Sequence, residues 1–131
     1  MGRKLDLDYN THQKIIKYCR QKKIKFLSAP FDLDSIDMLV RLGLETLKLP
    51  SGSITDLPYL RKIGGLNKNI ILSTGMSSLV EVIDAYNILV SSGTDKNKIV
   101  VLQCNTEYPT PMEDVNLKAM HTIRDTLDVE V

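Results

Sequence analysis

Six polar side chains lie at the ends of apolar runs in this sequence, and their types suit the binding of a small anion. They are Lys48 and Ser51 around one run, Ser73 at the end of the next, and Asn105, Thr106 and Tyr108 after the last. Lysine supplies a compact positive charge, whereas hydroxyl, amide and phenol groups supply short hydrogen-bond donors. Such a set favours a phosphate or a carboxylate as ligand. The two histidines, His12 and His121, fall within predicted helices and give no base for a nucleophile.

Each of these residues also has an ordinary structural explanation. Serine and threonine are frequent turn and cap residues after strands, so Ser51 or Ser73 taken alone favours a cap. Tyr108 has the alternative of packing against the rim. Lys48 favours function more strongly, because a lysine that ends a buried strand must find an anion or extend to water. Ser73-Thr74 and Asn105-Thr106 stand at matching positions at the ends of their strands, which favours a shared binding role over separate caps.

The elements that would position these side chains alternate between strand and helix. Apolar spacing predicts helices over residues 9–23, 32–42 and 116–127, a short helix near Pro58, and another opened by the capping box Ser78–Glu81. Strands are predicted over residues 24–28, 46–49, 69–73 and 98–103, and a last one begins at residues 129–131. This alternation predicts an α/β fold of about four βα units with parallel strands. In such folds the polar ends of the strands collect at one rim.

The strand–helix pattern alone leaves an open doubly wound sheet and a closed barrel as alternatives. No G-x-G-x-x-G or Walker sequence follows a strand, which weakens a nucleotide-binding interpretation. A closed (β/α)8 barrel needs about 250 residues, whereas this chain has 131. We therefore expect residues 1–131 to be a partial TIM barrel, an excerpt of a larger catalytic domain.

Composition limits the classes of partner. The chain carries 17 basic and 16 acidic residues, so its net charge favours neither nucleic acid nor a membrane surface as partner. No apolar run approaches the roughly 20 residues that span a bilayer. Two cysteines are too few for a disulfide framework, which is typical of the cytoplasm.

Four ordered motifs carry a family resemblance. They are F-L-S-A-P-F-D from residue 26, L-K-L-P-S-G-S-I-T from residue 47, I-L-S-T-G-M from residue 71 and Q-C-N-T-E-Y-P-T-P from residue 103. Their order and spacing resemble the sialic acid synthase (N-acetylneuraminate synthase) family over essentially the whole chain. The resemblance places the chain in the middle of the family's catalytic TIM barrel, without its flanking strands and its C-terminal antifreeze-like domain.

The resemblance implies that phosphoenolpyruvate condenses with N-acetylmannosamine to give N-acetylneuraminate and phosphate. It implies phosphoenolpyruvate-binding roles for Lys48, Ser51 and Ser73, and contacts to the amino sugar for Thr106 and Tyr108, with an amide role for Asn105. It also implies a divalent manganese or magnesium ion whose ligands lie outside this chain, and a homodimer for the full-length enzyme. No residue of the chain is assigned a catalytic role.

Two departures and two alternatives accompany this expectation. Ala29 and Ser53 stand where many family members have a threonine and an acid, which removes a phosphate-binding hydroxyl and a candidate for handling the attacking water. Legionaminic and pseudaminic acid synthases of the same family differ in sugar rather than in chemistry. An alternative of another class is a non-catalytic half-barrel that binds an anion or serves in assembly. The fragment alone is expected to be inactive.

Overall fold

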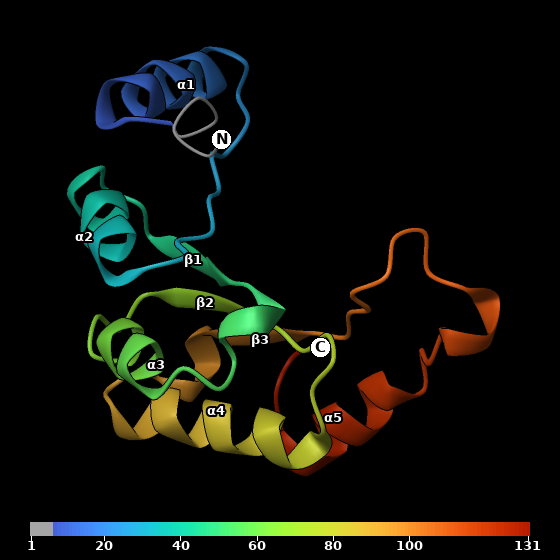
Figure 1. The fold of residues 1–131 in the computed structure, drawn as a ribbon. Coiled ribbons are helices and arrows are strands. Elements are labelled where there is room, and N and C mark those ends of the chain that lie inside the picture. The colour runs from blue at the N-terminus through green and yellow to red at the C-terminus, as the bar shows by residue number, and fades with distance from the viewer. Residues whose placement is uncertain (1–6) are drawn as a thin grey trace.

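The protein is an α/β structure of parallel strands and covering helices, seen in a computed structural model that describes residues 7–131 (Figure 1). Residues 1–6 of the predicted domain lie outside the described residues. The elements are α1 (Tyr9–Gln21), α2 (Leu33–Arg41), β1 (Thr46–Leu49), η2 (Ser51–Ser53), α3 (Leu57–Gly64), β2 (Asn69–Ser73), α4 (Leu79–Ser91), η3 (Lys96–Lys98), β3 (Ile99–Leu102), η4 (Met112–Asp114) and α5 (Ala119–Leu127).

The sheet contains three strands in the order β1-β2-β3, and both pairings are parallel. Leu49 of β1 lies opposite Leu72 of β2, which in turn lies opposite Val101 of β3. On the far side of β3 the backbone N–H of Val101 donates to the carbonyl of Glu130 at 2.9 Å. This contact belongs to a parallel bridge and confirms that the predicted last strand begins near the end of the chain.

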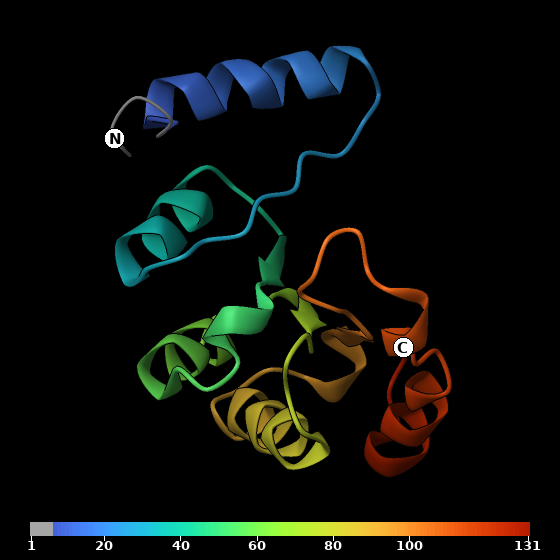
Figure 2. The same cartoon turned by 45° about the vertical axis from the view of Figure 1, so that its right-hand side comes forward.

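The core lies between one face of the sheet and helices α3 and α4 (Figure 2). Strand residues on this face, such as Leu47 and Leu72, are fully buried, as are Ile63 of α3 and Leu89 of α4. The predicted periodicity of both helices is therefore confirmed. The opposite face of the sheet is only partly covered, because alternate strand residues such as Lys48 are half-buried.

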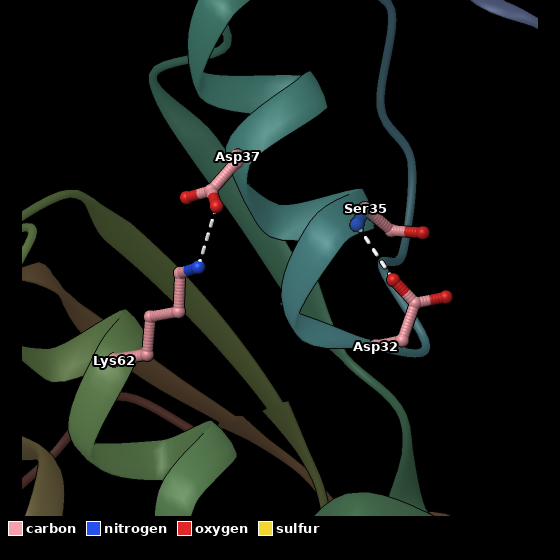
Figure 3. Close-up of polar contacts among 4 residues, drawn as sticks. All are labelled: Asp32, Ser35, Asp37 and Lys62. Atoms are coloured by element: carbon pink, nitrogen blue, oxygen red, sulfur yellow. Dashed lines mark hydrogen bonds and ion pairs between the residues drawn. The ribbon is translucent and has the colours of Figure 1, made fainter.

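Helix α2 is fixed at its start and against α3 by polar contacts (Figure 3). The backbone N–H of Ser35 donates to Asp32 at 2.6 Å, which caps the helix and holds the pKa of the Asp32 carboxyl below its ordinary value. Asp37 of α2 accepts a hydrogen bond from Lys62 of α3 at 2.7 Å. The first contact caps α2, and the second links α2 to α3.

The predicted strand over residues 24–28 does not form. This segment is extended but pairs with no other described strand, which leaves the outer edge of β1 open. A groove of about 770 Å³ lies between Leu27 and the side chains of Thr46 and Ile71. Phe26 packs edge-on against His12 of α1 instead, with ring centroids 5.9 Å apart. Apolar pattern alone predicted this strand, but a strand also needs a partner within hydrogen-bonding distance.

The end of this segment is nevertheless anchored to the core. The Tyr59 hydroxyl of α3 donates to the carbonyl of Pro30 at 2.7 Å, in a buried hydrogen bond. Burial, with a smaller contribution from the neighbouring carboxylates of Asp56 and Asp32, raises the pKa of Tyr59 well above its ordinary value. The phenol therefore stays protonated and holds the entry to α2 in place.

The bounds of three helices differ from those predicted, α2 only by one residue at each end because Asp32 and Leu42 are its caps. The first helix ends at Gln21 rather than residue 23, where Lys23 adopts a left-handed φ of 56° that a continuing helix does not allow. The last helix begins at Ala119 rather than residue 116, because the residues before it form turns. Within residues 7–131, no helix combines the length and the apolar character needed to cross a membrane.

Candidate substrate-binding site

The predicted rim forms at the carboxyl ends of β1, β2 and β3, which the parallel register brings to one edge of the sheet. Lys48 lies on the sheet face turned away from α3 and α4, opposite Ile71 of β2 and in line with Val100 of β3. Its side chain is half-buried, and within residues 7–131 its ammonium forms no ion pair. A cation on this open face is available to an anion at the rim.

The loops after the three strands meet at Gly75, a contact that we call the Gly75 junction (Ser51, Gly75 and Thr106). The Gly75 N–H donates to the Ser51 hydroxyl oxygen at 2.9 Å. A Cβ atom built on Gly75 would lie 2.8 Å from the Thr106 methyl carbon and 2.9 Å from Ser51 Oγ. Two predicted site residues, Ser51 and Thr106, are thus brought together at Gly75, which the sequence analysis did not single out.

Ser73 contributes a buried hydroxyl without a partner. Its side chain is 2% exposed, and its oxygen forms no hydrogen bond with any residue described by the structure. The adjacent Thr74 is different, since its hydroxyl donates to the carbonyl of Leu102 at 2.9 Å. Because an unpaired buried hydroxyl costs about 1–3 kcal/mol, such groups in proteins usually await a ligand or water. Ser73 is therefore suited to bind a ligand, and Thr74 to join β2 to β3.

A rim cavity of about 380 Å³ lies between the loop after β2 and the loop after β3. Asn105 and Thr106 line it, together with Gln103 and Asp114. The Asn105 amide donates to the backbone carbonyl of Asp114 at 3.2 Å, so this side chain fastens its own loop. Its predicted role toward a substrate can still be filled by the second N–H or by the oxygen of the amide.

Tyr108 is not brought into contact with the other predicted site residues. Its side chain is 84% exposed and is absent from the lining of the rim cavity. The structural alternative, in which Tyr108 packs against the rim, is therefore wrong for this structure. The long loop carrying it, drawn in orange between β3 and α5, extends well away from the sheet (Figure 1). Its predicted contact with the sugar stays a prediction.

A sequence profile of the NeuB family matches residues 1–131. The chain belongs to the NeuB family. An N,N'-diacetyllegionaminic acid synthase from Campylobacter jejuni is 50% identical over 131 residues, covering 100% of this chain and 39% of that protein. A pseudaminic acid synthase from the same species is 30% identical over 124 residues, covering 94% of this chain and 35% of that protein. The predicted family resemblance is confirmed.

A solved structure of a sialic acid synthetase supports the fold. N-acetylneuraminic acid synthetase from Leptospira borgpetersenii, crystallised with citrate, aligns with a TM-score of 0.87 at 26% identity. The alignment covers 92% of this chain and 41% of that protein. The partial TIM-barrel assignment is thus confirmed, and these relatives are nonulosonic acid synthases, which are enzymes. The chain spans between 35% and 41% of the length of the three relatives.

The residues that the structure describes do not fit a divalent metal. Among residues 7–131, no three His, Cys, Asp or Glu side chains gather closely enough to hold an ion. His12 is buried on α1 with its Nδ1 at 3.0 Å from the carbonyl of Asp8, and His121 lies on α5 beside Arg124. Both histidines are engaged locally, away from the Gly75 junction.

Proposed function

We propose that this chain forms the phosphoenolpyruvate-binding wall of a nonulosonic acid synthase. The observation that carries the proposal is the unpaired hydroxyl of Ser73, buried at the rim next to the Gly75 junction. Lys48, on the sheet face that α3 and α4 leave open, adds the positive charge that a phosphate or carboxylate requires.

The proposed reaction joins C3 of phosphoenolpyruvate to the aldehyde carbon of an open-chain amino sugar. The aldehyde oxygen takes up a proton to become a hydroxyl, and water adds to C2 to give a tetrahedral intermediate. The bond between C2 and the phosphate-bridging oxygen then breaks, C2 becomes a ketone as its new hydroxyl loses a proton, and hydrogen phosphate leaves. In this reaction Lys48, Ser51 and Ser73 bind and orient phosphoenolpyruvate. Thr106 and Asn105 contribute to the sugar side of the rim cavity, and Tyr108 reaches the sugar only if its loop folds back over the rim.

We propose a sugar carrying two acetamido groups as the first candidate substrate. The 50% identity to an N,N'-diacetyllegionaminic acid synthase supports it, compared with 30% to the pseudaminic acid synthase. N-acetylmannosamine, which the sequence resemblance implied, is the second candidate and is supported by the structural likeness to an N-acetylneuraminic acid synthetase.

The remaining parts of the proposal concern the full-length protein. A divalent manganese or magnesium ion would be held by residues outside this chain, because those described here offer no suitable group of ligands. We further propose a homodimer located in the cytoplasm, taking part in the synthesis of bacterial surface polysaccharide.

The proposal is tested by assaying phosphate release from a full-length protein that contains this chain. Phosphoenolpyruvate is supplied with manganese and either N-acetylmannosamine or a sugar with two acetamido groups. We expect phosphate release that requires a sugar and is faster with the diacetamido sugar. Absence of release with every sugar, combined with anion binding by calorimetry, would instead support the non-catalytic half-barrel.

A further inference from the structure

Gly75 occupies a space in which no side chain fits. A Cβ atom there would approach the Thr106 methyl carbon to 2.8 Å, Ser51 Oγ to 2.9 Å and Ser51 Cβ to 3.3 Å. The first two distances are shorter than real Cβ contacts, so the Thr106 or Ser51 side chain, or the loop that carries it, would have to shift. The backbone of Gly75 is outside the left-handed region, so space rather than φ requires glycine at this position.

The same residue sets the orientation of the Ser51 hydroxyl. A serine hydroxyl has a single proton and accepts through its lone pairs. The Gly75 N–H occupies an acceptor site of Ser51 at 2.9 Å, and no acceptor for the Ser51 proton is found within residues 7–131. The Ser51 proton is thereby left to donate to a ligand.

We propose that Gly75 is a positioning residue that holds Ser51 as a hydrogen-bond donor to the phosphoenolpyruvate anion. This inference rests on the proposed function and adds to it a residue that makes no substrate contact through a side chain. Gly75 acts in two ways, through its N–H, which orients the serine hydroxyl, and through its missing Cβ, which lets the loops after β1 and β3 approach each other.

The central experiment measures steady-state kinetics of Gly75→Ala in the full-length protein. We expect the KM for phosphoenolpyruvate to rise at least about tenfold, the effect of losing one hydrogen bond to a charged group. The KM for the sugar should change much less. Gly52→Ala is the matched control, because a Cβ on Gly52 meets nothing within 4 Å and its φ is ordinary. Gly52→Ala should keep the wild-type KM for phosphoenolpyruvate.

A double-mutant cycle separates positioning from a general loss of packing. If Gly75 acts through Ser51, then Gly75→Ala should have little further effect on the KM for phosphoenolpyruvate in a Ser51→Ala background. An equal rise of that KM in both backgrounds would overturn the proposal. Ser51→Ala alone should also raise the KM for phosphoenolpyruvate, and an unchanged value would overturn the proposal whether or not Gly75→Ala folds.

A second variant covers the case in which Gly75→Ala folds poorly. Thr106→Ser removes the methyl carbon at 2.8 Å and should restore the melting temperature of Gly75→Ala toward that of Thr106→Ser alone. The KM for phosphoenolpyruvate should nevertheless stay raised in the double variant, because Ser51 is still displaced. A wild-type protein that releases no phosphate and binds no phosphoenolpyruvate would reject the proposed function, whereas an active wild type with a normal Gly75→Ala rejects only this inference.

Discussion

Lys48 is the residue on which the charge of the candidate site depends. It lies between two buried leucines near the end of β1, and its side chain points to the open sheet face. Among residues 7–131 it forms no ion pair. A lysine in this position can keep its stem packed while its ammonium binds an anion. Binding and folding should therefore respond differently when only the charge is removed.

We predict that Lys48→Met in the full-length protein raises the KM for phosphoenolpyruvate at least about tenfold, because a charge-assisted hydrogen bond contributes about 1.5–3 kcal/mol. Methionine preserves most of the apolar stem, so the melting temperature should change little. Lys68→Met is the control, since Lys68 pairs with Glu45 beside the start of β2, at the opposite end of the sheet. Equal KM values for both variants would leave Lys48 as a structural residue.

Most substitutions of buried residues lower the stability of a protein, but we predict that Ser73→Ala weakens phosphoenolpyruvate binding without lowering stability. Because the Ser73 hydroxyl is buried without a partner, its removal should leave the free energy of unfolding unchanged or slightly higher. The KM for phosphoenolpyruvate should rise. Thr74→Val, which removes a hydroxyl bonded to Leu102 at 2.9 Å, should instead lower that free energy by about 1 kcal/mol. Urea unfolding and kinetics of the two variants would test this contrast, and a clear destabilisation by Ser73→Ala would contradict it.

At the scale of elements, α4 leads away from the rim and begins with a complete capping box. Ser78 Oγ accepts from the Glu81 N–H at 3.3 Å, and Glu81 accepts from the Ser78 N–H at 2.7 Å. The backbone hydrogen bond from Ser78, assisted by its hydroxyl, lowers the pKa of Glu81 below 4.5. Since the loop before this helix contains Gly75, we expect fraying of α4 to loosen the Gly75 junction.

The lowered pKa of Glu81 predicts the sign of one pH effect. A carboxyl whose pKa is lower in the folded than in the unfolded state adds stability above the unfolded value, near 4.5, and this stability is lost as the pH falls through the folded pKa. In Glu81→Gln, the protection of α4 amides against hydrogen exchange should therefore fall less steeply below pH 4.5 than in the wild type. Asp84→Asn, at an exposed position of the same helix, is the control. Hydrogen exchange of α4 amides across this pH range is the measurement, and identical profiles for both variants would contradict the prediction.

At the scale of the whole molecule, the sheet has one edge without a hydrogen-bonded neighbour among the described strands and one face that α3 and α4 do not cover. The outer edge of β1 pairs with no described strand, and the sheet face carrying Ile71 and Leu102 is not covered by α3 or α4. Leu102 is 37% exposed at the end of β3. Unpaired edges and exposed apolar faces both favour association with another chain.

We therefore predict that the isolated 131-residue chain forms a dimer or a larger species. Light scattering over a range of concentrations should give at least twice the mass of 14.8 kDa. Ile71→Lys, which places a second positive charge beside Lys48 on the open face, should shift the population toward monomer. A concentration-independent monomer with a cooperative melt would contradict the prediction.

The isolated chain should also lack synthase activity. Its described residues contain no group of ligands for a metal, and the sugar-side Tyr108 is 84% exposed. Phosphate release with phosphoenolpyruvate, manganese and either sugar should stay at background, with the full-length protein as the positive control. Turnover above background by residues 1–131 would show that the essential parts lie within them.

The order of elements and the identity of the rim residues could be predicted from the sequence alone. Helical spacing predicted α3 and α4, apolar runs predicted β1 and β2, and the Ser78–Glu81 pattern predicted the start of α4 to the residue. Such features depend on neighbours within about four residues, so local pattern contains the information needed. Because parallel strands align their carboxyl ends, this order also sufficed to place Lys48, Ser51 and Ser73 at one rim.

Tertiary structure alone decided how the rim residues relate to one another. In the sequence nothing distinguishes Gly75 from an ordinary turn glycine. Only the structure shows that it lies between Ser51 and Thr106, each of which is at least 24 residues away along the chain. The Ser73 hydroxyl likewise lacks a hydrogen-bond partner only because no described segment places a donor or acceptor beside it. The segment 24–28 has the pattern of a strand but lacks a partner within reach. Contacts between distant segments fix these features, and no local pattern encodes such distances.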